Sequence, residues 1–196
     1  MRALLIGCAA LLVAAGAARA QDKFGLPELH AVKTATLAPP YSCRSAAEFK
    51  GGYEGTALFL SAYSEQRNSP DLLFNGACGG DNYFEAATAG NDLAMLADLG
   101  TGLLVENISA QDIYMTLGPR KAPFVQETRY VSYVPVKLNH TYAVVLNKSE
   151  VRGVFVFTVT AYEPDKRVEL RYAVKNYQVQ QTVAASAGFD WGKTSH

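Results

Sequence analysis

The stretch that decides the fold runs from Val154 to Val179 and reads VFVFTVTAYEPDKRVELRYAVKNYQV. β-Branched and aromatic residues, which favour strands, fill its first half. Glu163–Lys166 follows, with Pro and Asp in the order that a type I turn prefers. In the second half, apolar and charged residues alternate with the period of a strand. We predict a β-hairpin here.

The alternation also predicts the register of this hairpin. If Tyr162 pairs with Arg167 across a four-residue loop, four apolar pairs share one face: Ala161 with Val168, Val159 with Leu170, Phe157 with Tyr172, and Phe155 with Val174. The charged side chains then lie on the other face, which we expect to meet solvent: Arg167, Glu169, Arg171 and Lys175. A slip of one residue would bury these charges, so the pattern disfavours every other register.

Outward from the hairpin, short apolar runs alternate with turn residues about every ten residues, which is typical of a sandwich or barrel. The predicted strands are 56–63, 71–77, 83–88, 93–99, 103–108, 112–117, 124–138 and 141–146, with Pro135 marking an edge or a bulge. No part of residues 21–196 carries a long apolar stripe of helical period. We predict an all-β fold, a single antiparallel β-sandwich of about nine or ten strands, with a small closed β-barrel as the alternative.

The two ends of the sequence differ in composition from the predicted strands. Residues 1–20 have a positive start, an apolar segment and an Ala18-Arg19-Ala20 cleavage site, which together predict a signal peptide. We expect residues 21–52 to form an extended N-terminal arm, residues 53–180 the sandwich domain and residues 181–196 a frayed, flexible tail. The protein is therefore expected to be exported, to the periplasm or the exterior, without a membrane span after cleavage.

Export also shapes the expectation for the cysteines. Cys8 leaves with the signal peptide, so the exported chain keeps Cys43 and Cys78. In an oxidising compartment these two are predicted to form a disulfide, and two separate buried thiols are the alternative. A nucleophilic cysteine is disfavoured, because a disulfide removes the thiolate that such chemistry requires.

Charge argues against nucleic acid as a partner. Without Arg2 and Arg19 the chain has 16 basic and 18 acidic residues, and no basic cluster. A polyanion needs a positive surface, so we expect neither nucleic acid nor an anionic membrane surface to bind.

Chemistry-bearing patterns are sparse. The common hydrolase, metalloprotease and nucleotide-binding signatures are missing from the sequence, and we expect no cofactor. A metal site joining His30, His140 and His196 would need both chain ends to fold onto His140. Two groups of carboxylates are candidate functional sites. They are a calcium site from Asp81, Glu85, Asp92 and Asp98, and a carboxylate pair for hydrolysis from Asp81 and Asp92 or from Glu127 and Glu163.

Tyrosines are the more suggestive group. Six crowd the C-terminal half and are the candidate binding face for a glycan or a partner protein: Tyr130, Tyr133, Tyr142, Tyr162, Tyr172 and Tyr177. Ordinary cross-strand packing is the competing interpretation. The leading hypothesis is an exported, non-enzymatic β-domain that acts as a binding or accessory module of the cell envelope or exterior. The alternatives are a secreted hydrolase with a carboxylate site and, more weakly, a barrel that holds an apolar ligand.

Overall fold

The computed structural model describes residues 25–38, 55–76, 79–86, 93–117 and 128–180. The predicted signal peptide, the predicted tail and the two cysteines of the predicted disulfide, Cys43 and Cys78, lie outside these residues. The described chain forms nine strands, two short α-helices and a 3-10 helix: β1 (Val32–Leu37), β2 (Ala57–Leu58), α2 (Ala62–Gln66), β3 (Leu72–Gly76), β4 (Asn82–Glu85), β5 (Leu93–Thr101), η2 (Val105–Asn107), α3 (Ala110–Leu117), β6 (Tyr133–Pro135), β7 (His140–Asn147), β8 (Val151–Glu163) and β9 (Arg167–Val179).

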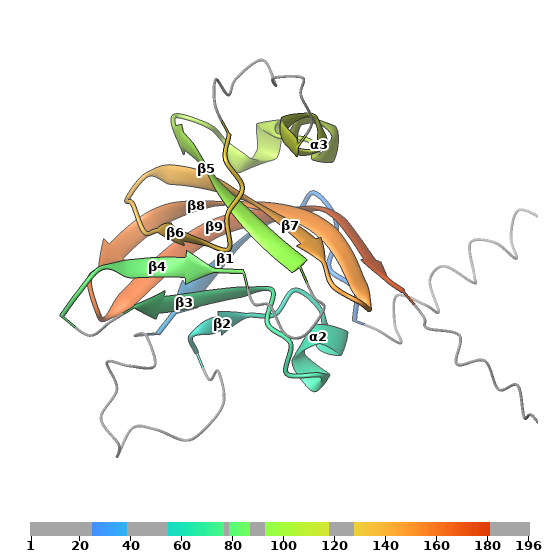
Figure 1. Cartoon of the computed structure of the whole chain (residues 1–196), viewed down its shortest axis with the longest axis horizontal. Coiled ribbons are helices and arrows are strands. Elements are labelled where there is room, and N and C mark those ends of the chain that lie inside the picture. Colours follow the sequence, from blue (N-terminus) through green and yellow to red (C-terminus); the bar gives the residue numbers. More distant parts are fainter. Residues whose placement is uncertain (1–24, 39–54, 77–78, 87–92, 118–127, 181–196) are drawn as a thin grey trace, which may run out of the picture.

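The strands form two antiparallel sheets, as the sequence predicts for a sandwich. The larger sheet has the order β1-β9-β8-β7-β5 and the smaller has the order β2-β3-β4-β6, and neither closes into a barrel. Figure 1 shows the smaller sheet against one face of the larger sheet and α3 over the other face. No described helix packs on the outer face of the smaller sheet. Within the described ranges, this face is therefore the broad surface of the sandwich that no helix covers, and we call it the open face.

The predicted hairpin is confirmed as β8 and β9, and so are three of its four apolar pairs: Val159 with Leu170, Phe157 with Tyr172, and Phe155 with Val174. The fourth pair is wrong. Near the turn, Glu163 faces Arg167 and Ala161 faces Glu169. An irregularity between Val159 and Ala161 then brings the following pairs, from Val159 with Leu170 onward, into the predicted register. The loop is shorter than predicted, and Asp165 adopts a left-handed conformation with φ 58°, which Asp tolerates better than most residues.

Only part of the charged face of β9 meets solvent as the alternation predicts: the side chains of Arg167, Glu169 and Arg171 are 51%, 40% and 37% exposed, but Lys175 is buried. Lys175 lies at a second irregularity, between Val154 and Phe155 on the facing strand, and only 4% of it is exposed. Ala173 on the same strand belongs to a second apolar cluster that includes Val105 of η2 and Ile113 of α3. The helical layer therefore buries part of the face that the sequence assigns to water.

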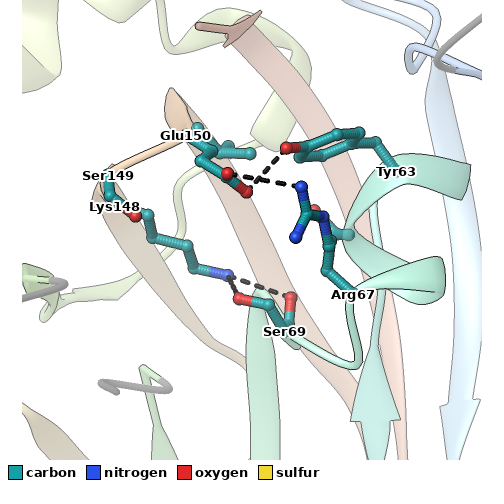
Figure 2. A pocket seen from close by; sticks show the side chains of 8 residues that line it. Tyr63, Arg67, Ser69, Lys148, Ser149 and Glu150 are labelled. Carbon is teal, nitrogen blue, oxygen red and sulfur yellow. Dashed lines mark hydrogen bonds and ion pairs between the residues drawn. The ribbon is translucent and has the colours of Figure 1, made fainter. Parts of the chain in front are cut away.

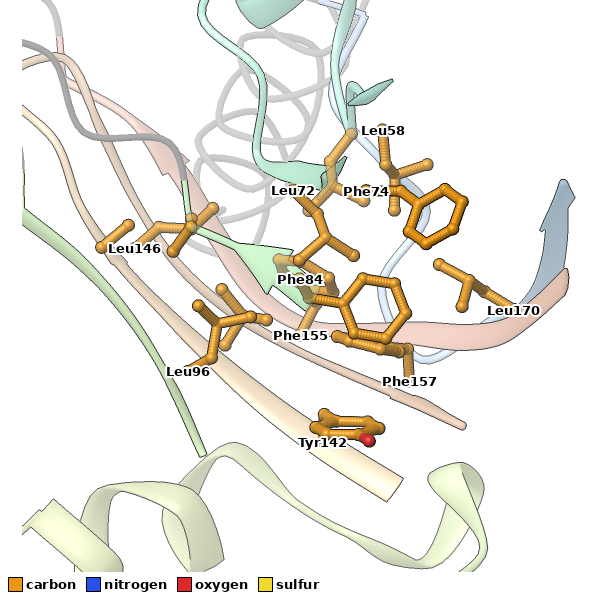
Figure 3. Packing of buried hydrophobic residues seen from close by; sticks show 14 of the residues in the cluster. Leu58, Leu72, Phe74, Phe84, Leu96, Tyr142, Leu146, Phe155, Phe157 and Leu170 are labelled. Atoms are coloured by element: carbon orange, nitrogen blue, oxygen red, sulfur yellow. The ribbon is translucent and has the colours of Figure 1, made fainter. Parts of the chain in front are cut away.

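Between the sheets lies an aromatic and aliphatic core, which Figure 3 shows. Tyr142 stacks on Phe157 with ring centroids 5.0 Å apart, and Phe84 of the smaller sheet meets Phe157 edge-on at 4.9 Å. Phe155, Phe157 and Leu170 are fully buried, so the inward face of the hairpin is the face that the alternation predicts. Edge-to-face aromatic pairs add about 0.5–1.5 kcal/mol beyond the apolar area that they bury.

Two segments predicted as strands are helical. Residues 112–117 belong to α3, and η2 lies within 103–108. Ser109 and Asp112 bond reciprocally at the start of α3: the Ser109 amide donates to Asp112 Oδ2 (2.8 Å) and the Asp112 amide donates to Ser109 Oγ (3.1 Å). This exchange is a capping box, which satisfies amides that have no partner within the helix.

The first predicted strand, 56–63, also ends early. Only Ala57–Leu58 forms a strand, and α2 begins at Ala62. Ser61 caps this helix by accepting a hydrogen bond from the Ser64 amide. Upstream, part of the predicted arm is the edge strand β1, paired with β9. Pro135 is confirmed in an edge strand, because β6 is the last strand of the smaller sheet.

Candidate functional site

The six candidate tyrosines do not share one face. Tyr142 and Tyr177 are buried in the core between the sheets. Tyr162 and Tyr172 pack at the margin of that core, and Tyr130 packs against the helical layer. Tyr133 alone of the six is prominently exposed, at 61%. A predicted face made of all six is therefore not formed, although Tyr133 remains a candidate for surface recognition.

The open face around Tyr133 is built by strand alternation. In the smaller sheet the inward residues are buried, whereas their neighbours point outward. Pairing sets the outward residues in two rows: Leu73, Glu85 and Tyr133 across β3, β4 and β6, and Asn75, Tyr83 and Pro135 beside them. We call these six residues the tyrosine platform. Residues two apart on a strand share a face, so the rows are adjacent.

Two aromatic rings form the centre of the tyrosine platform. Tyr83 and Tyr133 are diagonal neighbours on β4 and β6, with ring centroids 5.6 Å apart and planes tilted by 60°. Tyr83 is half-buried and Tyr133 projects into solvent. Because the rings pack on each other, the exposed Tyr133 ring is braced rather than free to turn. The sequence prediction missed Tyr83; its alternation with buried Asn82 and Phe84 was the available signal.

Polar groups lie beside these rings. Asn75 Nδ2 donates to Glu85 Oε2 at 3.2 Å, and Asn75 Oδ1 accepts from the Gly76 amide at 2.9 Å. Glu85 stands directly opposite Tyr133 in the strand pairing. The Asn75 contacts orient the Glu85 carboxylate next to the aromatic surface. Its other oxygen, Oε1, still has acceptor capacity for a ligand hydroxyl.

A second candidate is a small cleft between α2 and the turn that joins β7 to β8 (Figure 2). Its volume is about 30 Å³, which suits roughly one water molecule. Tyr63 donates to Glu150 Oε2 at 2.6 Å, and Arg67 lies 3.4 Å from the other Glu150 oxygen. The acidic and basic side chains around the cleft therefore engage each other, and little room is left for a substrate.

Beneath this cleft lies a buried ion pair. Lys148 Nζ is 3.0 Å from Asp71 Oδ1, and both side chains are almost wholly buried. The ammonium also donates to Ser69 Oγ at 3.3 Å and to the carbonyl oxygens of Ser69 and Pro70 at 3.1 and 2.7 Å. A serine beside a lysine suggests a nucleophile with its base. Lys148 Nζ, however, already has four oxygen atoms of this buried network within hydrogen-bond distance, so its N–H groups are occupied by structural partners.

Tyr177 extends the buried network. Its hydroxyl lies 2.9 Å from Ser61 Oγ, 2.7 Å from Ser64 Oγ and 3.5 Å from Asp71 Oδ2. Burial, together with the charge of Asp71, raises the pKa of the Tyr177 hydroxyl. Tyr177 therefore stays protonated and ties β9 to α2, which is a structural role.

The carboxylates considered for calcium or hydrolysis are dispersed where the structure describes them. Asp81 is exposed in a turn and Glu85 belongs to the tyrosine platform. Asp98 of β5 contacts Lys137 Nζ at 3.0 Å and His140 Nδ1 at 2.8 Å. Asp92 and Glu127 lie outside the described residues.

The histidine prediction has a similar outcome. His30 and His140 are described, and His196 is not. Within the described ranges, no three residues of the metal-binding types are grouped closely enough to hold an ion. The pairing of His140 with Asp98 is a contact that the sequence prediction missed, because the two residues are 42 positions apart.

No helix in the described part of the chain is long and apolar enough to cross a membrane. In comparisons with known proteins, no family model, curated protein or solved structure matches the chain. Its function is therefore inferred from the chemistry of its own surfaces.

Proposed function

We propose that the chain is an exported, non-enzymatic binding module and that the tyrosine platform is its ligand-contacting surface. The observation that carries this proposal is the exposure of Tyr133, 61% of the residue, on a sheet face where its ring packs against Tyr83. A large aromatic ring left in water forgoes the free energy of burying its apolar surface. Aromatic residues are enriched where proteins meet ligands and partners.

Binding is favoured over hydrolysis by the state of the charged groups. Lys148 and Asp71 neutralise each other in the interior, and Asp98 is held by Lys137 and His140. Asp81 is exposed to solvent. General acid–base catalysis needs groups within reach of a bound substrate, and the side chains in these ion pairs are engaged with each other.

The test is retention on the insoluble envelope and extracellular material of the source cells. Purified full-length protein is mixed with this material and sedimented, and the bound fraction is measured. We expect retention of the wild type and its loss in the double variant Tyr83→Ala, Tyr133→Ala.

Tyr114→Ala is the matched control, because Tyr114 is an exposed tyrosine on α3, in the helical layer of the fold. This control should be retained like the wild type. Equal retention of all three proteins would overturn the proposed binding surface.

A further inference from the structure

The size of the tyrosine platform indicates what kind of ligand fits it. Strands are about 4.8 Å apart and rise about 3.3 Å per residue, so the six platform residues on three strands cover roughly 200 Å², against the about 800 Å² that each partner of a stable protein complex buries. The platform is thus too small to hold a folded protein by itself. Its dimensions suit a ligand of one to a few rings.

Charge and ring packing narrow the chemistry further. Glu85 is the single charged residue among the six platform residues, so a nucleic acid or another polyanion would be repelled. The Tyr83 and Tyr133 rings touch each other at a centroid distance of 5.6 Å. A quaternary ammonium group needs space between aromatic walls, and rings in direct contact leave none.

From these observations we infer that the tyrosine platform binds a neutral pyranose glycan, with a sugar ring stacked on Tyr133 and its hydroxyls bonded to Glu85, which Asn75 holds in place. The inference rests on the proposed function and names its ligand class. A pyranose has an apolar face of C–H groups and a rim of hydroxyls. The braced Tyr133 ring matches the C–H face, and a carboxylate next to an amide matches the rim.

The platform assigns a separate role to each side chain. Tyr133 supplies the stacking surface, and Tyr83 holds that ring in place. Glu85 accepts hydrogen bonds from sugar hydroxyls, and Asn75 orients Glu85 through the 3.2 Å contact. In small-molecule sites, a small number of polar groups beside an apolar surface fixes the orientation of the ligand.

The experiment is calorimetric titration of the full-length protein with neutral hexasaccharides. The probes are cellohexaose, chitohexaose, xylohexaose, maltohexaose and laminarihexaose. We expect measurable binding of at least one probe, about tenfold weaker for Tyr133→Ala because the stacking contact is lost. Glu85→Gln should weaken the same titration severalfold, because an amide accepts hydrogen bonds less strongly than a carboxylate.

The control is again Tyr114→Ala, which should bind like the wild type, and circular dichroism checks that each variant is folded. If a probe binds wild type and Tyr133→Ala equally, the inference is overturned. If no probe binds although envelope retention still depends on Tyr133, the glycan assignment fails and the binding function stands. If neither assay depends on Tyr133, both fail.

Discussion

Lys148 and Asp71 form an ion pair in the interior, with Nζ and Oδ1 3.0 Å apart and side chains 3% and 0% exposed. Asp71 Oδ2 also accepts from the Leu60 amide at 2.9 Å. The pair joins the turn between β7 and β8 to the segment between α2 and β3. Buried charges are tolerated only where each is compensated, and here each is.

Removing one partner of this pair should be severe. Lys148→Met leaves the Asp71 carboxylate uncompensated in the interior, so we expect the free energy of unfolding to fall by about 3–5 kcal/mol. Adding Asp71→Asn removes the stranded charge while keeping an oxygen for the Leu60 amide, so the double variant should be more stable than Lys148→Met alone. Urea denaturation measures all three proteins.

Arg67→Ala provides the surface control for this prediction. Its pair with Glu150 is exposed, with a separation of 3.4 Å, and should contribute at most about 1 kcal/mol. A double variant no more stable than Lys148→Met would contradict the compensation argument.

Replacing Lys175, the other buried lysine, should not lower the stability of the protein. Only 4% of Lys175 is exposed, and Glu106 lies near enough to act on its charge. Burial lowers the pKa of Lys175, against the opposing effect of Glu106. Lys175→Met removes the cost of burying a charge and keeps the length of the side chain, so we expect unchanged or raised stability at neutral pH.

The effect of Lys175→Met on stability should depend on pH. The lowered pKa means that the folded state disfavours the charged amine, so the penalty is present below that pKa and fades as pH rises toward the ordinary value of 10.5. The advantage of Lys175→Met, measured by urea denaturation, should therefore shrink between neutral and alkaline pH. An unfolding free energy more than about 1 kcal/mol below that of wild type would be the contrary result.

Asn82 holds the tip of the hairpin to the smaller sheet. Asn82 Oδ1 accepts from Tyr162 Oη at 2.9 Å and from the Asp165 amide at 2.8 Å, while Asn82 Nδ2 donates to Asp165 Oδ1 at 2.7 Å. Asn82→Ala deprives several buried or half-buried groups of a partner and should cost about 1–3 kcal/mol.

Tyr162→Phe is the graded comparison for Asn82→Ala. It removes one of these hydrogen bonds and should cost about 0.5–1.5 kcal/mol. Thermal unfolding of the two variants side by side measures the difference. The bridging role of Asn82 would be disproved by a smaller loss for Asn82→Ala than for Tyr162→Phe.

The sequence predicted the parts of the fold in which local alternation and burial agree. Phe155, Phe157 and Leu170 point into the core because every second position on their strands is apolar. Alternation predicts which residues share a face but not what covers that face. It therefore missed the helical layer over Ala173 and the burial of Lys175.

Short helices and the platform were missed for different reasons. The eight-residue helix α3 is too short for a clear apolar stripe, and its signal is the capping exchange between Ser109 and Asp112. Tyr83 and Tyr133 are 50 positions apart and become neighbours only through the pairing of β4 with β6. Only the order of the strands in space brings the two rings together, and local sequence does not carry that information.

Asp98 should make the larger sheet sensitive to acid. Burial alone would raise the pKa of this carboxyl, but hydrogen bonds from His140, the Gly100 amide and Lys137 outweigh burial and lower it. The folded state thus favours the ionised carboxylate. Its contribution to stability is complete above the ordinary value of 3.8 and is lost as pH falls through the lower folded value.

Asp98→Asn tests this dependence, because asparagine keeps an oxygen for the Gly100 amide, which bonds Asp98 Oδ1 at 2.9 Å. The variant should be less stable than wild type near pH 6, and the difference should narrow steadily below about pH 4 as the wild-type carboxylate takes up its proton. Lys137→Met removes one of the three stabilising hydrogen bonds and should show a smaller acid dependence than wild type. A stability difference between Asp98→Asn and wild type that stays constant from pH 6 down to acid unfolding would mean that the Asp98 contacts do not favour its charge in the folded state.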